Sequence, residues 1–574
     1  MTSALPTTTS NKQGSLAHGS WRRVTGRIVV GAVCALTASS LLMPSISLAA
    51  EWIDVDGNQY NAGTAAGDDA GTWNWDGADD MQLNGYNGGT IKAAGKLNLS
   101  YGGDNTVTNN NGRGILVEDG ANENAELNIQ GGASDTLNVT SSSDAIISIG
   151  DINIDGAGTV NATSTGFDAI DAKGDLTIKG SGNVNATGDS DGIRADGNIT
   201  IDNSGTVTAK ATEDQGIDAN ENLTIKGGGK VEASSVKDEA IEADGDIEIS
   251  GGSQVKASSE EDAAVDGKGS LTVTNASLNA SGVGYGIYVY KGVTLDGATV
   301  TVRASSDGDD VLALFTDEDD IVIKNGSTVD AFAKGRFSAA IATRNYDPNG
   351  AGGHIYISDS VVKAIARYAE TGGDGPDHYS TDQNDEIIPE HRGTNLGIFA
   401  QTSEGITPAT ISIIRSRVTA EGDTAAIFAL AMSADGKAIG TIEIEGSTIL
   451  TPEGGKVIDY RNKEELSDGV VYGAGQTIGT GDATISDIND PSVAKSAVIA
   501  SPETPATDTK PEAKPQTAKT TKAAATTKTK GATLAIGNAG LAATGDASLV
   551  SAIAGAFAGL AALGTGIITR RKRS

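Results

Sequence analysis

The amino-acid sequence predicts an all-β protein built around a right-handed parallel β-helix, a solenoid with about 24 residues and three short strands in each coil. The first observation is a repeat: "DGIRADGNITIDNSGTVTAKATED" (191–214) is followed directly by "QGIDANENLTIKGGGKVEASSVKD" (215–238). The second is that each block contains three short runs in which apolar and polar residues alternate, which is typical of strands with one buried face. The third is that Gly, Asn and Asp separate these runs, as turns require.

The repeat extends beyond these two blocks. One apolar position, which we call the rung residue, recurs at Ile146, Ile170, Ile193, Ile217, Ile241, Val265, Ile287 and Val311. It follows Gly or Ala at all of these positions except the last. A period in the twenties that is sustained along the chain indicates a solenoid. Its coils should stack about 4.8 Å apart, and the crossover rule for parallel strands gives the right-handed form. We expect the β-helix to occupy residues 85–490, with an inserted loop at 368–393.

The N-terminal segment has the features of an export signal. Residues 1–49 combine a basic stretch, a short apolar run and small residues before a cleavage point. Cys34, the only cysteine, lies inside it, so the mature chain has no disulfide and no cysteine ligand for a metal. We expect residues 50–84 to cap the open end of the solenoid, with a sugar-stacking platform as the alternative. This segment holds Trp52, Trp73 and Trp75.

The C-terminal segments predict an anchor. Residues 491–540 are rich in Pro, Thr and Lys and form an extended linker. Residues 541–574 contain a pentapeptide, an apolar run at 547–569 long enough to span a bilayer, and a basic tail. The pentapeptide consists of Leu541, Ala542, Ala543, Thr544 and Gly545.

This arrangement resembles the cell-wall sorting signal of Gram-positive surface proteins, the LPxTG type in its LAxTG form. The resemblance implies that a sortase attacks the Thr544 carbonyl and transfers the chain to peptidoglycan. The protein would then be exported, covalently attached to the cell wall and exposed at the cell surface. A transmembrane anchor that is never cleaved is the alternative.

Charge narrows the range of partners. The chain carries a formal net charge of −33, which repels nucleic acid and attracts cations. Carboxylates recur at fixed offsets from the rung residues, and Ca²⁺ takes six to eight oxygen ligands of this kind. We expect Ca²⁺ as the bound ion, most simply where Asp214, Asp218, Asp238 and Glu242 come from adjacent coils; solvated acids are the alternative. The candidate ligands are Asp168, Asp171, Asp189, Asp191, Asp214, Asp218, Asp238, Glu242, Asp262 and Asp266.

Aromatic and basic residues suggest further sites. Tyr288 and Tyr290 alternate along one expected strand, so both should face outward and could stack on sugar rings; shielding of a sheet is the alternative. The inserted loop contains His378, His391 and Arg392 beside many acids, a combination that a polysaccharide lyase could use. A solvated loop is the simpler interpretation, and we assign no catalytic residue.

Two stretches carry a resemblance to a known family. Blocks that join "GIDA" (216–219) to a strand such as "LTIK" (223–226), together with "GTWNWDGADDMQLNGYNGG" (71–89), resemble a family of secreted bacterial carbohydrate-binding domains. The resemblance covers about residues 140–310. It implies a calcium-binding right-handed β-helix, similar to pectate lyases, that binds cellulose and acidic plant polysaccharides. The sequence departs from the family pattern at Gln215 and Ala263, where an acid is lost.

We therefore expect a cell-wall-anchored surface protein whose acidic β-helix binds carbohydrate through Ca²⁺. It should be a binding protein and not an enzyme. An adhesin or structural stalk for a protein or host-glycan partner is the first alternative. A polysaccharide lyase or hydrolase is the second.

Overall fold

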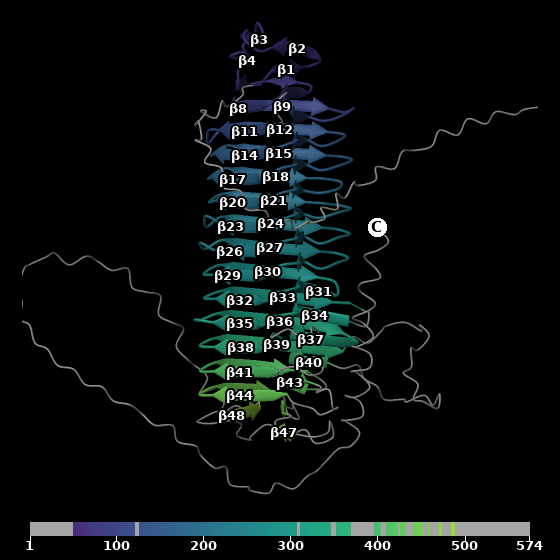
Figure 1. Ribbon diagram of the computed structural model, residues 1–574, viewed down its shortest axis with the longest axis vertical. Helices are drawn as coiled ribbons and strands as arrows, with labels where there is room; N and C mark the ends of the chain where they lie inside the picture. Colours follow the sequence, from purple (N-terminus) through teal and green to yellow (C-terminus); the bar gives the residue numbers. More distant parts are fainter. Residues whose placement is uncertain are drawn as a thin grey trace, which may run out of the picture. The chain divides into compact units, whose positions relative to one another are not determined.

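The computed structural model describes residues 50–120, 125–306, 310–345, 352–368, 395–402, 409–422, 425–431, 440–451, 457–459, 470–472 and 484–487. Within these residues every regular element is a β-strand, and the strands form three long sheets that run along a stack of coils (Figure 1). The prediction of an all-β parallel β-helix with three strands per coil is confirmed.

Each coil gives one strand to each sheet. Sheet I, which carries the rung residues, contains β1 (Trp52–Val55), β2 (Asn58–Asn61), β7 (Ile91–Ala94), β10 (Ile115–Glu118), β13 (Ile146–Ser148), β16 (Ile170–Ala172), β19 (Ile193–Ala195), β22 (Ile217–Ala219), β25 (Ile241–Ala243), β28 (Val265–Gly267), β31 (Tyr285–Val289), β34 (Asp310–Thr316), β37 (Phe337–Asn345), β40 (Asn395–Thr402), β43 (Ala425–Ala431), β46 (Val457–Asp459) and β47 (Val470–Tyr472). Sheet II contains β3 (Ala66–Gly67), β4 (Trp73–Trp75), β5 (Asp80–Asn84), β8 (Lys96–Gly102), β11 (Glu126–Gly131), β14 (Asp151–Gly156), β17 (Leu176–Gly180), β20 (Ile199–Asn203), β23 (Leu223–Lys226), β26 (Ile247–Ile249), β29 (Leu271–Thr274), β32 (Val293–Asp296), β35 (Ile321–Lys324), β38 (Ile355–Ser358), β41 (Thr410–Ile414) and β44 (Thr441–Glu445). Sheet III contains β6 (Asn87–Gly88), β9 (Asp104–Asn109), β12 (Thr136–Ser141), β15 (Thr159–Ser164), β18 (Asn183–Thr187), β21 (Thr206–Lys210), β24 (Lys230–Ser235), β27 (Gln254–Ser259), β30 (Ser277–Gly282), β33 (Thr299–Ser305), β36 (Thr328–Gly335), β39 (Val361–Tyr368), β42 (Arg417–Glu421), β45 (Thr448–Thr451) and β48 (Thr484–Asp487).

The register between coils follows the sequence repeat. Ile217 pairs with Ile193 in the preceding coil and with Ile241 in the next. The prediction that Val311 continues this row is wrong, because Ile287 pairs with Leu314. The chain advances 27 residues from Ile287 to Leu314, against 24 from Ile217 to Ile241, so the rung residue lies further toward the C-terminus.

The interior of the stack consists of rows of like apolar side chains. Leu223 and Ile247 in sheet II are fully buried, as are Val207 and Val231 in sheet III. Burying such a side chain contributes about 1.5–3 kcal/mol. The contribution requires a neighbouring coil to cover it, so the stability of one coil depends on the next.

A small residue precedes each rung residue because the chain bends there against the next coil. A Cβ added at Gly216 would lie 2.6 Å from the Ala240 carbonyl oxygen, which is closer than real Cβ contacts. This bend brings the residue two positions before the rung residue beside the residue one position after it. The rings of Tyr285 and Tyr288, which flank Gly286 and Ile287, lie 5.3 Å apart.

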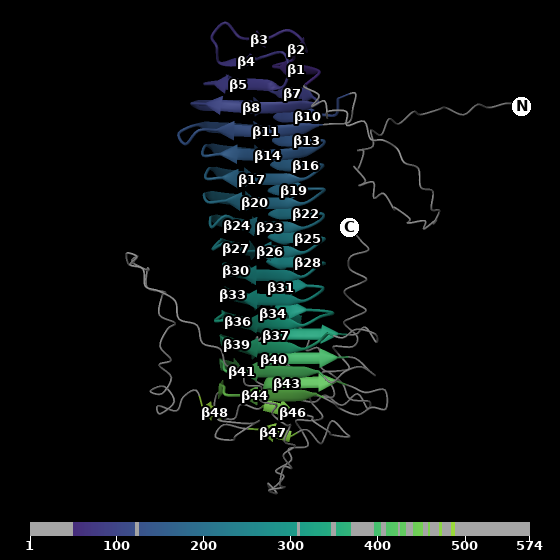
Figure 2. The same cartoon turned by 60° about the vertical axis from the view of Figure 1, so that its left-hand side comes forward.

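The N-terminal end of the stack differs from the regular coils (Figure 2). Here β1 pairs antiparallel with β2 and β7, and β4 pairs antiparallel with β3 and β5. Trp73 and Trp75 are buried in the core, and the Trp75 indole N–H donates a hydrogen bond to the Ala78 carbonyl at 2.9 Å. Their faces are therefore covered by protein, which removes these two residues as a sugar-stacking platform.

Several predicted segments lie outside the described residues. They are the export signal at 1–49, the linker at 491–540, and the sorting signal at 541–574 with its apolar run. The inserted loop at 368–393, with its histidines and Arg392, also lies outside them except for Tyr368. A search of the described residues finds no helix that is long and apolar enough to cross a membrane.

Candidate functional site

Two neighbouring rows of charged side chains follow the outer face of sheet I. The first row lies two positions before the rung residues. The second lies one position after them, and its members pair in register from coil to coil. We call the two rows together the acidic strip. Its first row is Asp144, Asp168, Asp191, Gln215 and Glu239, and its second row is Asp171, Arg194, Asp218, Glu242 and Asp266.

Three buried carboxylates meet at one end of the acidic strip. One oxygen each of Asp144, Asp168 and Asp171 lies within 4.8 Å of the others. Two oxygens that share one Ca²⁺ at about 2.4 Å are at most about 4.8 Å apart. The spacing and the all-oxygen donor set of this trio therefore fit a calcium ion.

The surroundings of the trio leave one oxygen unsatisfied. Asp144 accepts a hydrogen bond from Arg113 Nε at 2.8 Å, and Asp168 accepts one from the Asp191 backbone N–H at 3.0 Å. Asp171 pairs through Oδ2 with Lys173 Nζ at 2.7 Å. Asp171 is only 2% exposed, and its Oδ1 has no hydrogen-bond partner within the described part of the chain. A buried polar atom without a partner is costly, and a bound ion is one explanation for it.

Burial shifts the titration of these acids. It raises the pKa of Asp171 to about 6, although Lys173 opposes the shift. Burial also raises the pKa of Asp168, and the charge of Asp144 adds to the increase. Without a cation, the site favours protonated carboxyl groups more than water does.

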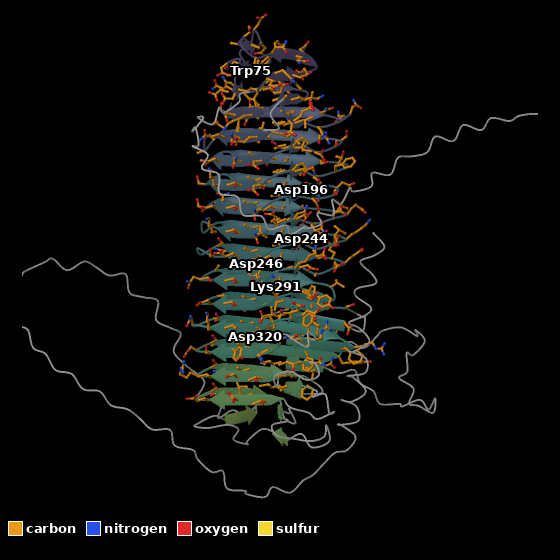
Figure 3. All side chains as sticks on the ribbon, viewed as in Figure 1. Trp75, Asp196, Asp244, Asp246, Lys291 and Asp320 are labelled. Atoms are coloured by element: carbon orange, nitrogen blue, oxygen red, sulfur yellow. The ribbon has the colours of Figure 1, made fainter. Side chains whose placement is uncertain are left out.

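Arg194 occupies the second row in the middle of the acidic strip. Its Nη2 lies 3.2 Å from Asp196 Oδ1, and its Nε lies 3.6 Å from Asp218 Oδ2; Asp196 is labelled in Figure 3. Burial lowers the pKa of this guanidinium, but the charges of Asp218 and the neighbouring acids outweigh burial and raise it. The arginine is therefore a fixed positive charge.

The far end of the strip concentrates acids again. Burial, followed by the charge of Glu242, raises the pKa of Asp218 to about 7. Burial and the contact with Asp238 raise the pKa of Glu239 to about 10. Gln215, which takes the place of an acid in the first row, donates from Nε2 to Glu239 at 3.2 Å and to Glu242 at 2.9 Å.

A further row of acids lies in the turn that precedes sheet I. Asp214 accepts a hydrogen bond from the Ser190 hydroxyl, while Asp238 and Asp262 each accept one from the following backbone N–H. One oxygen each of Asp238, Glu239 and Asp262 lies within 4.8 Å of the others. Asp189 lies in an equivalent turn, where its backbone N–H donates to the Phe167 carbonyl at 3.1 Å.

The structure does not bring the four expected calcium ligands into one group. Asp214 and Asp238 belong to the turn row, whereas Asp218 and Glu242 belong to the second row of the strip. Each of the two groups that form beside sheet I contains two predicted ligands and one residue, Asp144 or Glu239, that was not among them. The recurrence of an acid two positions before the rung residue was the signal that could have found them.

Other acids on the solenoid have a structural role. At the turn between sheets I and II, Asp175 accepts the backbone N–H of Asn198 at 2.7 Å, and Asp246 accepts that of Ser270 at 2.9 Å. This hydrogen bond lowers the pKa of Asp246, which Figure 3 labels. Such residues fix the stacking of one coil on the next.

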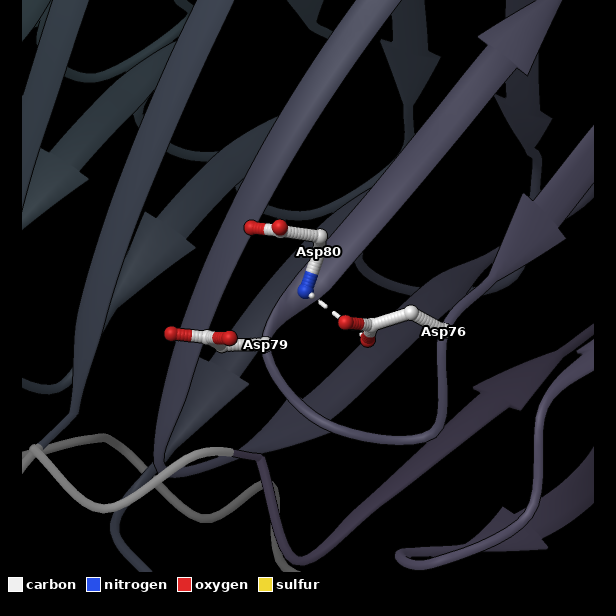
Figure 4. A group of neighbouring side chains, drawn as sticks. All are labelled: Asp76, Asp79 and Asp80. Atoms are coloured by element: carbon white, nitrogen blue, oxygen red, sulfur yellow. Dashed lines mark hydrogen bonds between the residues drawn. The ribbon is translucent and has the colours of Figure 1, made fainter.

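An exposed acidic group near the N-terminal end is also explained by its turn (Figure 4). Asp76, Asp79 and Asp80 lie close together. Asp76 Oδ1 accepts backbone N–H groups from Ala78 at 2.8 Å and Asp80 at 3.2 Å. These hydrogen bonds account for the position of the Asp76 carboxylate without an ion.

Beyond Asp266 the same two rows become apolar, and the second row becomes largely aromatic. The second row continues through Tyr288, Phe315, Ala342, Phe399 and Phe428. The Tyr288 and Phe315 rings stack at 5.6 Å, and the Phe399 and Phe428 rings stack at 5.7 Å. We call this part the aromatic strip. Phe315, Ala342 and Phe399 also line a cavity of about 30 Å³.

The structure corrects the expectation of two exposed tyrosines in a row. Tyr288 lies in β31 but is partly buried between Tyr285 and Phe315, and its hydroxyl contacts Asp317 at 3.4 Å. Tyr290 follows the strand and is 41% exposed. Of the two, only Tyr290 is exposed.

The fold and the strip define a class of protein: an acidic parallel β-helix with oxygen-rich, cation-attracting corners on one sheet. Residues 162–308 match the profile of a family described as carbohydrate-binding domain-containing protein. The matched segment includes the acidic strip from Asp168 to Asp266 but not Asp144. No match was found among curated proteins or among solved structures.

Proposed function

We propose that the protein is a cell-surface carbohydrate-binding protein whose acidic strip holds Ca²⁺ and uses it to bind acidic polysaccharide. The observation that carries the proposal is the buried trio of Asp144, Asp168 and Asp171 with its unpartnered oxygen. The family match over residues 162–308 supports carbohydrate as the ligand class.

Charge explains why a cation is needed. A chain with a net charge of −33 repels an anionic polymer. Bound Ca²⁺ would reduce this repulsion and, because it takes six to eight oxygens, leave positions for sugar hydroxyl or carboxylate oxygens. Asp144, Asp168 and Asp171 would hold the ion, while Arg113 and Lys173 keep two of the carboxylates in place.

Aromatic residues would contribute to binding of the sugar rings. Tyr290 lies one coil beyond Asp266 and is 41% exposed, so it could contact a sugar ring beside the strip. The partly buried Tyr288 would support this surface from the aromatic strip. A polysaccharide lying along sheet I would then contact carboxylate-bound cations first and aromatic rings next.

We propose a binding role and not catalysis. An adhesin or stalk remains the first alternative, and it would bind its partner regardless of calcium. A polysaccharide lyase or hydrolase is the second, and it would release products from a polymer.

The test of this function is binding to polygalacturonate with Ca²⁺ and with EDTA. We expect binding in Ca²⁺, loss of binding in EDTA, and loss in the double variant Asp168→Asn/Asp171→Asn. The matched control is Asp76→Asn/Asp79→Asn, which removes two charges from the exposed turn group and should bind normally. Undiminished binding in EDTA would contradict the calcium bridge.

Attachment to the cell wall through a sortase is a separate part of the proposal. It rests on the order of pentapeptide, apolar run and basic tail in residues 541–574. Replacing Thr544 with Ala should prevent transfer to peptidoglycan. Muramidase treatment of cells should then release the wild-type chain from the wall but not the variant. Equal release of both chains would refute sortase attachment.

A further inference from the structure

Arg194 is an exception in its row. The second row of the acidic strip runs Asp171, Arg194, Asp218, Glu242 and Asp266, so the arginine takes a place where its neighbours carry carboxylates. Register pairing sets Arg194 directly between Asp171 and Asp218.

The Arg194 guanidinium interacts with several carboxylates. Its Nε lies 3.6 Å from Asp218 Oδ2, and its Nη2 lies 3.2 Å from Asp196 Oδ1. The guanidinium also interacts electrostatically with Asp191 and Asp171. Its side chain is 32% exposed, so the positive charge lies at the level of the strip surface.

The acidic groups that could hold an ion lie on either side of this coil. Asp144, Asp168 and Asp171 form one group before it, and Asp238, Glu239 and Asp262 form another after it. Within the described residues no such group includes a residue of β19. A guanidinium stays charged at every relevant pH, so it repels a cation most strongly within its own coil.

We propose that Arg194 is a built-in cation that replaces a bound Ca²⁺ in its coil and so limits the number of ions along the acidic strip. The inference rests on the proposed calcium binding and extends it. Arg194 offsets one negative charge beside Asp196 and Asp218 without an ion from solution. The trio before it pairs two of its carboxylates with Arg113 and Lys173 but keeps one buried oxygen available to an ion. The strip is thereby divided, and a continuous row of closely spaced divalent ions cannot form.

The experiment counts calcium ions bound to the full mature chain by equilibrium dialysis and by native mass spectrometry. Arg194→Gln should bind one more Ca²⁺ per chain than the wild type, and Ca²⁺ should raise its Tm more. Arg194→Lys keeps the charge and should retain the wild-type number. Arg415→Gln is the matched control, because it also removes one arginine from a close pair, with Asp359. It should leave the number unchanged.

Each outcome decides one of the two ideas. If the wild type binds Ca²⁺ and Arg194→Gln binds the same number, the role of Arg194 is refuted while the calcium site stands. If the wild type binds none but Arg194→Gln gains an ion, the calcium site of the wild type fails and the role of Arg194 is supported. If neither binds, both fail.

Should Arg194→Gln fold poorly without Ca²⁺, the variant Arg194→Gln/Asp218→Asn removes the charge that was left unpaired. This double variant should fold and gain no ion.

Discussion

The stability of the calcium-free protein should fall as the pH rises, and Asp218 provides the clearest case. Its carboxyl group has an ordinary pKa of 3.8, which burial and Glu242 raise to about 7 in the folded state. A carboxyl with a raised pKa binds its proton more tightly in the folded chain than in the unfolded one. Its stabilising contribution is therefore complete below pH 3.8 and is lost as the pH rises through about 7.

The size of this effect follows from the two pKa values. At about 1.36 kcal/mol per pKa unit, a rise from 3.8 to about 7 corresponds to about 4 kcal/mol. The Asp218 side chain is only 14% exposed, so solvent screening reduces this figure modestly. Asp171, whose pKa is raised to about 6, should add a smaller loss over a lower pH range.

The assay is urea unfolding in EDTA at pH 5 and pH 8 for the wild type and Asp218→Asn. An amide cannot ionise, and only the part of the loss between pH 5 and about 7 falls inside this window, so the variant should gain stability relative to the wild type by up to about 2.7 kcal/mol between the two pH values. Added Ca²⁺ should reduce the wild-type loss at pH 8 by favouring the ionised carboxylates. If the difference between the two proteins is the same at both pH values in EDTA, the assigned burial of Asp218 is refuted.

Three further outcomes test the fold, the ion and the absence of catalysis. Ile217→Ala in the core row should cost about 2–5 kcal/mol in urea unfolding, whereas the exposed-face change Thr224→Ala should cost under about 1 kcal/mol; equal costs would contradict the register. Saturating Ca²⁺ at a hundredfold excess over Kd should stabilise the wild type by about 2.7 kcal/mol, and calorimetry should show that Asp168→Asn/Asp171→Asn loses most of this gain. Incubation with pectic and cellulosic polymers should yield no reducing ends and no unsaturated products. Steady product release would show that the chain is an enzyme.

The fold could be predicted because the sequence repeat of each coil gives the register in which it pairs with the next coil. In a parallel β-helix like residues stack on like residues, so the sequence period and the hydrogen-bond register are the same quantity. Ile193, Ile217 and Ile241 illustrate this directly. The prediction was wrong at Val311, because this coil contains more residues than the regular ones. The alternation of apolar and polar residues continues, but the residue that pairs with Ile287 is Leu314.

The candidate site was harder to predict than the coils. The expected ligands were grouped by sequence offset, as if every second residue faced outward. The bend at the small residue before each rung residue breaks that rule and sets positions three apart beside each other, as with Asp168 and Asp171. The aromatic strip was not anticipated as a unit, because insertions vary the sequence spacing between Phe315, Phe399 and Phe428 while the spatial register is kept.

The change from acidic to aromatic side chains between Asp266 and Tyr288 has a consequence for how such proteins diversify. Each coil adds one position to each row and about 4.8 Å to the stack. Duplicating or deleting one coil would therefore lengthen or shorten one chemical zone by a single step and leave the other zone intact. The length of each zone can therefore change in steps of one coil to suit a longer or shorter ligand. Duplication or deletion of a whole coil does not alter the packing inside the coils that remain.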